Sequence, residues 1–531
     1  MKIKYFLALL PFFIVNEVNA QLIPSSINLE GNSLRKVSSE TPISNSITDI
    51  LAVGDTVWLG TSRGLSRSTD RGLSWTNYFG SPDFGQEDIA SLAYYKGVIW
   101  AATAHSVEKS GQELSEGSGF RYSTDNGKTW KSITQPLDQL NDTVVVYGIN
   151  KIRALPVTVA VNNLAYDIAI ANNTIWIASY AGGLRKSTDM GKTWQRVVLP
   201  PDYLNSIKPT DTLKFSLQPV SGSFGPENNL NHRVFSVVAT DDSTIYVGTA
   251  GGINKSTDGG ISWRKFNHLN QANPISGNFV VALGYNAQNK TIWAATWKAE
   301  EQSEFYAVSY SSDGGETWHT ALNGEKAHNF GFVNNDAIAL TDNGAFRTNN
   351  VGVDWLLPSS IIDKDTKVPL PAGAFYAATS QANANHGNDI WLGADKGLAR
   401  LTETNGMWLG DWKVFIASQP LESVNDAFAY PNPFSPDVES VNIKYSTGGI
   451  RANVTIRIFD FGMNLVRTVI QNAERGNPIH SLETGNAEKN GVVDFWDGRD
   501  DKGNVVPNGV YFYRIDVGSN SPVYGKIMVL M

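Results

Sequence analysis

The octapeptide STDRGLSW at residues 68–75 decides the fold of this chain, because it returns at intervals along most of the sequence. The five clear copies keep serine first, aspartate two positions later, glycine four positions later and tryptophan seven positions later. The further copies are STDNGKTW at 123–130, STDMGKTW at 187–194, STDGGISW at 256–263, SSDGGETW at 311–318 and the worn TNNVGVDW at 348–355. Such repetition indicates that one small structural unit is stacked several times.

The spacing within the octapeptide predicts a tight turn between two strands. Aspartate side chains accept hydrogen bonds from nearby backbone amides, and glycine adopts the positive φ that closes such a turn. The tryptophan then begins the returning strand and buries a large ring. The turn-forming aspartates are Asp70, Asp125, Asp189, Asp258 and Asp313. A catalytic role for these acids is the alternative, but a turn explains all five at once, and we adopt that interpretation.

A second recurring strand precedes each turn and sets the number of units. It reads TVWLGT at 56–61, VIWAAT at 98–103, TIWIAS at 174–179, TIYVGT at 244–249, TIWAAT at 291–296, AIALTD at 337–342 and DIWLGA at 389–394. These seven units divide residues 46–416 into stretches of about 53 residues, enough for four short strands each. Sheets that cannot bury both faces alone must stack, and radial stacking closes a propeller.

The sequence therefore predicts an all-β protein with a seven-bladed β-propeller over 46–416. The N-terminal segment 21–45 precedes it. Within that segment, Leu34–Val37 resembles the strand that follows each octapeptide. We expect it to supply an outer strand of the last blade and so to close the ring.

The octapeptide resembles the Asp-box, or BNR, repeat of sialidase-like and sortilin-like propellers. The resemblance implies the propeller fold without implying one function, because the same fold hosts hydrolases, receptors and assembly factors. Sialidases of this class carry a Phe/Tyr-Arg-Ile-Pro segment before the first box and three arginines that grip a carboxylate. No such segment precedes Ser68, so the resemblance does not extend to sialidase activity.

The chain changes character near Pro431-Asn432-Pro433, which cannot continue regular structure. After a linker at 417–430, residues 431–531 show the alternation that is typical of half-buried antiparallel strands. The predicted strands are 441–447, 452–460, 464–470, 492–498, 509–518 and 522–531. A small β-sandwich of roughly a hundred residues fits this pattern.

This C-terminal region resembles the Ig-like domain of flagellar hook-cap proteins and the related sorting domains of type IX secretion. The resemblance rests on YPNPFSP at 430–436, TIRIFDFGMNLVRTV at 455–469, FWDGRDDKGNVVPNGVYFYRI at 495–515 and GKIMVLM at 525–531. It implies an Ig-like sandwich that routes the chain through the outer membrane of a Gram-negative bacterium. The outer-membrane secretion machinery is then one expected partner.

The first twenty residues have the pattern of a secretory signal peptide. Lys2 and Lys4 give a positive start, Tyr5–Val15 is apolar, and Val18-Asn19-Ala20 is a small-residue cleavage site. A membrane anchor is the alternative, but eleven apolar residues cannot span a bilayer. We expect an exported protein, secreted or at the cell surface, that does not span the membrane.

Composition excludes several classes of site and partner. The chain has no cysteine, so disulfides, thiolate metal sites and cysteine nucleophiles are ruled out. Its formal net charge is −8 and no run of lysine and arginine exceeds two residues, which argues against a nucleic-acid partner. Asp497, Asp500, Asp501 and Asn504 crowd one loop, but their spacing does not match a twelve-residue calcium loop. We interpret that loop as a turn closed by Gly503, and expect no metal or cofactor.

Candidate binding residues come from long insertions between the repeats, which topology places on the face opposite the octapeptide turns. The insertions are 104–118, 131–166, 195–233, 264–279, 297–306 and 356–373. The candidate ligand-binding residues within them are His105, Tyr203, His232, Arg233, Trp297 and Glu300.

These observations favour an exported, non-catalytic β-propeller that binds an extracellular protein or glycan. One alternative is a secreted glycoside hydrolase or lyase that uses a carboxylate pair on the insertion-rich face. Another is an assembly or stability factor. Two carboxylates that face each other across a cleft would favour the hydrolase.

Overall fold

The computed structural model describes most of the chain after the N-terminal segment. The described residues are 38–39, 41–218, 229–365, 368–370, 372–383, 387–417, 427–430, 432–436, 440–448, 450–476 and 492–530. The expected signal peptide and Leu34–Val37 lie outside them. Apart from the short 3-10 helix η1 (Leu230–His232), every element named in the described part is a β-strand. The all-β prediction is therefore confirmed. No helix in these ranges is long and apolar enough to cross a membrane.

Between residues 47 and 415 the strands form successive antiparallel meander sheets, each of which runs from its innermost strand outward. The first sheet contains β2 (Ile47–Val53), β3 (Thr56–Thr61), β4 (Gly64–Ser68) and β5 (Trp75–Asn77), with β1 (Ser38–Ser39) on its outer edge. The second contains β6 (Asp88–Tyr95), β7 (Val98–Lys109), β8 (Gln112–Ser123) and β9 (Lys131–Ile133). The third contains β12 (Asp167–Ala171), β13 (Thr174–Ser179), β14 (Gly183–Ser187) and β15 (Gln195–Arg196).

The later sheets repeat this order. The fourth contains β18 (Val234–Ala239), β19 (Ile245–Thr249), β20 (Gly252–Ser256) and β21 (Trp263–Phe266), with β16 (Ser206–Ile207) on its outer edge. The fifth contains β22 (Phe279–Asn286), β23 (Thr291–Trp297), β24 (Ala307–Ser311) and β25 (His319–Ala321). The sixth contains β26 (Ala327–Val333), β27 (Asp336–Thr341) and β28 (Gly344–Thr348). The seventh contains β29 (Phe375–Asn383), β30 (Gly387–Ala394), β31 (Leu398–Glu403) and β32 (Gly410–Phe415).

A further sheet is built from the insertions at 131–166 and 195–233. It consists of β10 (Val144–Tyr147), β11 (Asn150–Ala154) and β17 (Ser216–Leu217), with β11 in the middle. Its buried side chains, among them Tyr147, Ile152 and Leu217, share one apolar core with residues of the third and fourth sheets. This core holds the insertion sheet against the repeats.

Each of the first five octapeptides forms the turn between the third and fourth strands of its sheet, and the sixth copy follows β28, the third strand of the sixth sheet. Side-chain hydrogen bonds close these turns. In the first copy, Ser68 Oγ donates to Asp70 Oδ1 at 2.7 Å and accepts the amide of Gly72 at 2.7 Å. Asp70 Oδ1 also accepts the amide of Ser74 at 2.9 Å. The same three bonds recur around Asp125, Asp189, Asp258 and Asp313.

The tryptophans of the octapeptides pack against the sheet that precedes them. Trp130 lies edge-on to Trp58 at 5.8 Å, and Trp263 lies edge-on to Trp176 at 6.5 Å. Trp75, from the first octapeptide, contacts Trp391 of the last sheet at 6.1 Å. The same contact that joins neighbouring sheets therefore joins the last sheet to the first.

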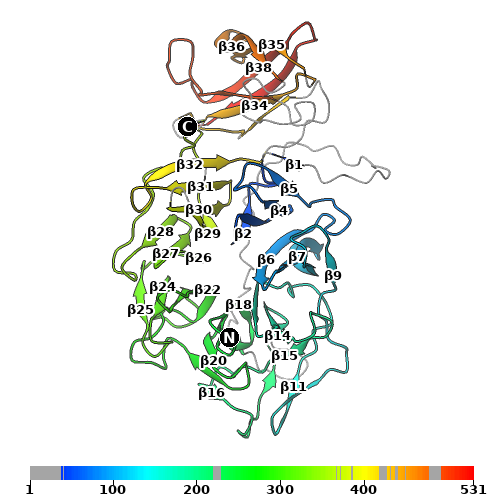
Figure 1. Cartoon of the computed structure of the whole chain (residues 1–531), viewed down its shortest axis with the longest axis vertical. Coiled ribbons are helices and arrows are strands. Elements are labelled where there is room, and N and C mark those ends of the chain that lie inside the picture. The colour runs from blue at the N-terminus through cyan, green and yellow to red at the C-terminus, as the bar shows by residue number, and fades with distance from the viewer. Residues whose placement is uncertain are drawn as a thin grey trace, which may run out of the picture. The chain divides into compact units, whose positions relative to one another are not determined.

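The sheets form a closed ring (Figure 1). In chain order, the innermost strands β2, β6, β12, β18, β22, β26 and β29 contact one another, and β29 contacts β2. The chain thus folds as a β-propeller. The last sheet takes all four of its strands from residues 375–415, whereas Ser38–Ser39 pair with β5 of the first sheet.

Residues after 427 form two antiparallel sheets around one core. One contains β33 (Ala427–Tyr430), β34 (Val441–Tyr445) and β37 (Val492–Trp496). The other contains β36 (Leu465–Arg475), β35 (Ala452–Phe459), β38 (Gly509–Val517) and β39 (Val523–Val529). Side chains of both sheets, including Ile443 and Ile456, are fully buried in a shared cluster, so this part is a β-sandwich. β33 pairs with β34 and lies inside the segment that the sequence marked as linker.

The acidic loop of the sandwich is a hydrogen-bonded turn. Asp500 Oδ1 accepts the amides of Lys502 and Asn504, both at 2.9 Å, and Gly503 has a φ of 85°. These bonds hold the Asp500 carboxylate within its own turn, and they lower its pKa.

Candidate functional site

A row of aromatic rings crosses five neighbouring sheets at one end of the ring, and we call it the aromatic arc. Its members are Tyr166, Tyr180, Phe235, Phe279, Trp297, Tyr306, His328 and Tyr376. Phe235 links the third sheet to the fifth, because its centroid lies 5.5 Å from Tyr166 and 4.7 Å from Phe279. Trp297 continues the row, 5.8 Å from Phe279 and 5.7 Å from His328. His328 then lies 4.9 Å from Tyr376 of the last sheet.

The position of the arc follows from how each sheet begins. Its members lie where innermost strands start or where second strands end, as Phe279 starts β22 and Trp297 ends β23. In an antiparallel meander this is the end opposite the octapeptide turns. The ladder shifts register at Phe235, His328 and Tyr376, and a bulge of this kind re-aims a side chain near a site.

Most rings of the arc are half-buried and so present part of their surface, whereas Trp297 is buried and 7% exposed. The Trp297 Nε1 donates to the carbonyl of Ala327 at 2.8 Å, which holds the indole in place. Burial raises the pKa of Tyr166 to about 12, and its phenol therefore stays protonated at neutral pH.

Two cations border the arc. The Arg233 guanidinium lies 5.4 Å from the centre of the Tyr180 ring, and Lys326 Nζ lies 5.1 Å from that of Tyr306. Arg233 is 6% exposed, so the partly exposed rings and Lys326 form the surface that is suited to stacking and hydrogen bonding with a ligand.

Of the candidate residues from the sequence, Arg233 and Trp297 contact the rings of the arc, and both side chains are buried. Tyr203 is 66% exposed, and its hydroxyl donates to the carbonyl of Lys214. Glu300 is exposed in the loop that follows β23. The structure does not bring the six candidates together into one site.

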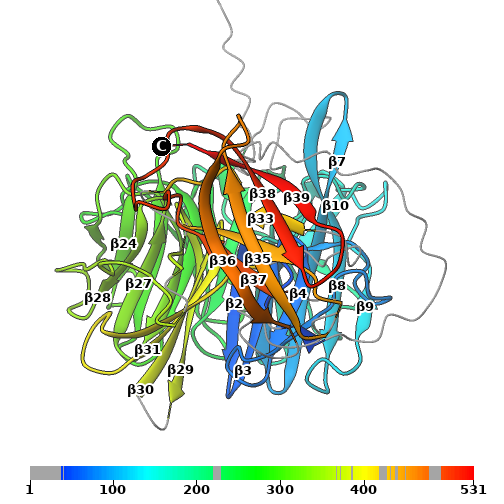
Figure 2. The same cartoon turned by 90° about the horizontal axis from the view of Figure 1, so that it is seen from above.

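His105 lies in a separate polar cluster at the base of the long β7–β8 hairpin, which projects from the ring in Figure 2. Its Nδ1 is 2.9 Å from Glu87 Oε2, and its Nε2 is 3.7 Å from Glu116 Oε2. Ser118 Oγ donates to the same Glu87 oxygen at 2.6 Å. Burial, together with the Glu87 charge, raises the pKa of the neighbouring Asp88 to about 6. The imidazole thus separates the two glutamates.

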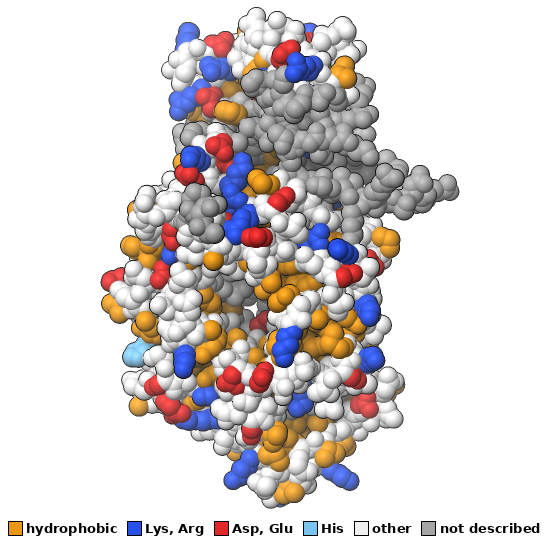
Figure 3. Space-filling model, in the orientation of Figure 1, with side chains coloured by type: hydrophobic (Ala, Val, Ile, Leu, Met, Phe, Trp, Pro, Cys, Tyr) orange, Lys and Arg blue, Asp and Glu red, His pale blue; other side chains and the backbone are white. Residues whose placement is uncertain are grey.

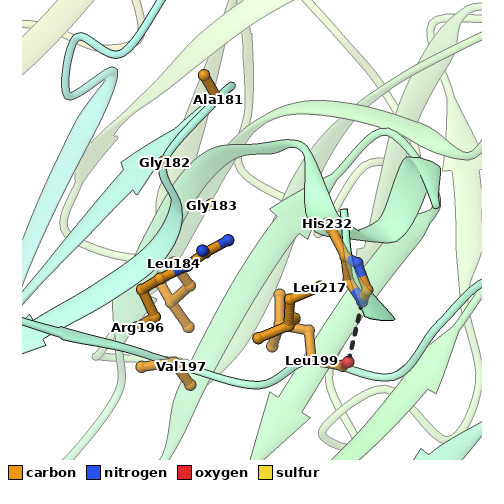
Figure 4. A pocket seen from close by; sticks show the side chains of 9 residues that line it. All are labelled: Ala181, Gly182, Gly183, Leu184, Arg196, Val197, Leu199, Leu217 and His232. Carbon is orange, nitrogen blue, oxygen red and sulfur yellow. Dashed lines mark hydrogen bonds between the residues drawn. The ribbon is translucent and has the colours of Figure 1, made fainter. Parts of the chain in front are cut away.

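His232 faces a small cavity of about 10 Å³ and lies across it from Arg196 (Figure 4). Its Nε2 donates to the carbonyl of Leu199 at 3.2 Å. Burial lowers the pKa of His232 to about 3, so the ring is neutral. A cavity of this volume holds no more than one water molecule, which makes it unsuitable for a larger ligand.

Two carboxylates on innermost strands join neighbouring sheets. Asp49 Oδ2 accepts the amide of Leu92 at 2.7 Å, and Asp167 Oδ2 accepts the amide of Val237 at 2.9 Å. Burial raises the pKa of Asp49 to about 6 and that of Asp167 to about 7, and the Asp49 charge contributes to the second shift. Figure 3 shows a hollow at the centre of the ring with an acidic side chain in it.

The sequence reasoning missed most of the arc. A usable signal was present, since an aromatic residue stands just before the apolar core of several innermost strands. It occurs in AYDIAI at 165–170, VFSVVA at 234–239, NFVVAL at 278–283 and FYAATS at 375–380. Tyr166, Phe235 and Tyr376 recur at one position of the repeat, and Phe279 lies two positions earlier in its own unit, whereas the candidate residues from the sequence lie in the insertions.

Residues 121–132 match the BNR/Asp-box repeat family. No curated protein matches the chain. Among solved structures it is similar to an ancestral GH74 enzyme, at 12% identity and a TM-score of 0.47, covering 92% of this chain and 63% of that one.

It is also similar to YCF48 from Cyanidioschyzon merolae, at 12% identity and a TM-score of 0.38, covering 68% of this chain and 93% of that one. A third is PorZ, a surface component of the type IX secretion system of Porphyromonas gingivalis, at 12% identity and a TM-score of 0.31. That match covers 91% of this chain and 65% of PorZ. The chain thus spans less than two thirds of the GH74 enzyme and of PorZ. The closed ring of sheets and the repeat match together make this chain a β-propeller that carries a BNR/Asp-box repeat.

Proposed function

We propose that this chain is an exported, non-catalytic β-propeller that binds an extracellular protein or glycan through the aromatic arc. The observation that carries the proposal is the continuity of the arc, from Tyr166 of the third sheet to Tyr376 of the last. Aromatic rings contribute large contact area at low conformational cost, and Lys326 adds a charged group at the border of the arc.

The carboxylates support binding over hydrolysis. A glycosidase needs an acid and a second carboxylate that are free to act on the substrate. Both oxygens of Asp49 and both of Asp167 accept backbone amides, and Glu87 is bonded to His105 and Ser118. Each of these three acidic groups therefore has a structural partner. The five octapeptide aspartates are assigned the same kind of role, in turns at the opposite end of the ring.

We further propose that the ring is a seven-bladed propeller in which each meander sheet is one blade. The closed order of contacts among the innermost strands supports this count. The sandwich after residue 427 is proposed to be the Ig-like sorting domain, with delivery to the cell surface or medium of a Gram-negative bacterium. Its order of motifs and its two-sheet core support that assignment.

Binding is tested with the mature protein against a glycan array and against extracellular proteins. We expect Phe279→Ala and Tyr376→Ala each to weaken the binding found by about tenfold or more, because each removes a stacking surface. Leu73→Ala and Ile261→Ala are matched controls, since these apolar side chains lie in octapeptide turns and are 75% and 55% exposed. Equal affinities of the arc variants and the controls would contradict the proposal.

The hydrolase alternative has its own measurement. Wild-type protein is incubated with every glycan that it binds, and new reducing ends are quantified. We expect none. Turnover that is lost in Asp167→Ser would replace the binding assignment with a catalytic one.

A further inference from the structure

The insertion sheet presents an apolar strand edge that the ring does not need. Its outer strand β10 reads Val144-Val145-Val146-Tyr147, and among the described residues it pairs only with β11. Val144 is 51% and Val146 is 70% exposed. Edge strands in natural proteins usually carry charges, prolines or bulges that prevent pairing with another chain, and β10 has none of these.

The register shows which backbone groups of β10 face outward. Val144 lies opposite Arg153 and Val146 lies opposite Lys151. The amide of Ala154 donates to the carbonyl of Thr143 at 2.9 Å, so Thr143 is a hydrogen-bonded position of the ladder. Because such positions alternate in an antiparallel pair, the amides and carbonyls of Val144 and Val146 point away from β11.

The edge is held rigidly. On its inner face, Tyr147 is buried in the core shared with the third and fourth sheets, and its hydroxyl donates to the carbonyl of Ile261 at 2.7 Å. At the hairpin turn, the side chain of Asn150 donates to the carbonyl of Asp211 and accepts the amide of Leu213. A partner strand would therefore meet a preorganised edge, which lowers the entropic cost of pairing.

The exposed face of this hairpin is apolar and basic. Lys151 and Arg153 are exposed beside Val146 and Val144, although the chain as a whole carries a formal charge of −8. The nearest acid in sequence, Asp142, accepts the amide of Gln139 and so belongs to the preceding turn. The exposed Lys151 ammonium thus favours a strand that carries acidic side chains.

We propose that β10 binds an extended acidic segment of a partner protein, which adds to the insertion sheet as a further strand. Backbone hydrogen bonds to Val144 and Val146 would supply the pairing. Because alternate residues of a strand point to opposite faces, the acidic side chains of the segment would lie on the face of Val144, Val146 and Lys151, and its apolar side chains would lie on the opposite face beside Val145. This surface is separate from the aromatic arc, so the inference stands independently of the proposed function.

Mature protein is titrated with a labelled peptide of alternating valine and glutamate, and anisotropy is followed. We expect saturable binding, with at least about tenfold weaker binding of a valine–lysine peptide and of a glutamate peptide interrupted by proline. Binding of neither regular peptide, or equal binding of both, would overturn the proposal.

The chain offers a sharp pair of variants. Val146→Pro removes an amide that points outward, so it should abolish binding while the β10–β11 ladder remains. Val146→Thr keeps that amide and should bind the peptide within about threefold of wild type. Lys151→Glu should reverse the preference towards the lysine peptide, which a purely structural role would not do. Undiminished binding by Val146→Pro would refute strand addition even if an acidic peptide binds elsewhere.

Discussion

At the residue scale, the octapeptide turns keep the same hydrogen bonds when the acidic side chain and its polar partner exchange positions. In the first copy the carboxylate of Asp70 accepts the Ser74 hydroxyl at 2.5 Å. In the worn copy, Asn350 takes the place of the aspartate and its amide donates to Asp354 Oδ2 at 2.8 Å. Asn350 Oδ1 still accepts the amide of Asp354 at 2.9 Å. The carboxylate thus stands at the fifth turn residue in the worn copy and at the first in the other copies, while the side-chain bond and the backbone-amide bond between these two residues are kept.

Two adjacent glycines in the fourth octapeptide allow the energetic cost of a positive φ to be measured separately from the cost of a steric clash. Gly259 and Gly260 both have positive φ, of 70° and 78°. A Cβ on Gly259 would meet nothing within 4 Å, whereas one on Gly260 would lie 2.4 Å from the Trp176 ring. We predict that Gly259→Ala lowers the free energy of unfolding by about 1–2 kcal/mol from the left-handed conformation alone. Gly260→Ala should cost about 1–3 kcal/mol more through the clash.

Chemical denaturation of the two variants measures this difference. Gly259→Ala is the control for the conformational contribution. If both variants lost the same free energy of unfolding, the Trp176 indole would have moved aside at no cost. Close packing between the sheets would then not explain why residue 260 is glycine.

At the element scale, polar side chains join several innermost strands to their neighbours. Asp49 of β2 accepts an amide of β6, and Asp167 of β12 accepts an amide of β18. Ser91 of β6 donates to the carbonyl of Ala165 at 3.2 Å in a similar place. Hydrogen bonds thus connect sheets that otherwise meet through apolar packing, and the carboxylates among them are held where ionisation is costly.

The raised pKa values of Asp49 and Asp167 predict a pH dependence. Between the ordinary aspartate value near 4 and the folded values of about 6 and 7, the folded state binds more protons than the unfolded state. The contribution of these two carboxyl groups to the free energy of unfolding should therefore fall as the pH rises from about 5 to about 8, whereas buried His232, with its pKa lowered to about 3, contributes in the opposite direction below about pH 6.5. The octapeptide aspartates have lowered pKa values and titrate below this window.

Guanidinium titrations at several pH values provide the measurement. Asp167→Ser is the matched variant, because serine already occupies the equivalent positions 91 and 236. We expect a shallower slope between pH 5 and 8 in this variant. A slope in Asp167→Ser that is equal to or steeper than that of the wild type would contradict the assignment.

At the scale of the whole molecule, the propeller and the sandwich have separate cores. The sandwich cluster draws on residues from Phe434 to Val529, and the clusters of the ring end at Phe415. Each part therefore contains the apolar side chains needed to fold alone.

We predict that deletion of residues 427–531 leaves a folded propeller with unchanged ligand binding that accumulates in the periplasm. The cut precedes β33, because that strand pairs within the sandwich. Circular dichroism and thermal melting test folding, and cell fractionation tests location against the full-length protein. Normal amounts of the truncated protein at the surface or in the medium would refute the sorting role.

Much of the fold was predictable because its signals are local. The turn bonds of Asp70 join residues no more than four positions apart, so an octapeptide was sufficient to predict them. The strands of the sandwich also lie close to their predicted ranges, since alternation over a few residues defines a half-buried strand. The missing fourth strand of the sixth sheet was not anticipated. There, β28 gains only the single bridge between Arg347 and Leu356 in place of a fourth strand, among the described residues.

The candidate site was less predictable because it depends on contacts between distant residues. His105, Tyr203 and Glu300 were chosen for residue type and loop position, and neither property says which side chains meet. Arg233 and Trp297 do belong to the arc, but their neighbours come from strands that the repeat pattern marked as framework.

By itself, the sequence determined the turn, the strand order and the repeated unit of this protein, because hydrogen bonding and hydrophobic alternation act over a few residues. Only the tertiary structure decided that Tyr166 and Tyr376, 210 positions apart, belong to one row of rings. It likewise decided that Trp75 packs on Trp391. Closure of the ring brings these residues together, since each sheet buries its faces only against its neighbours and the last must therefore meet the first.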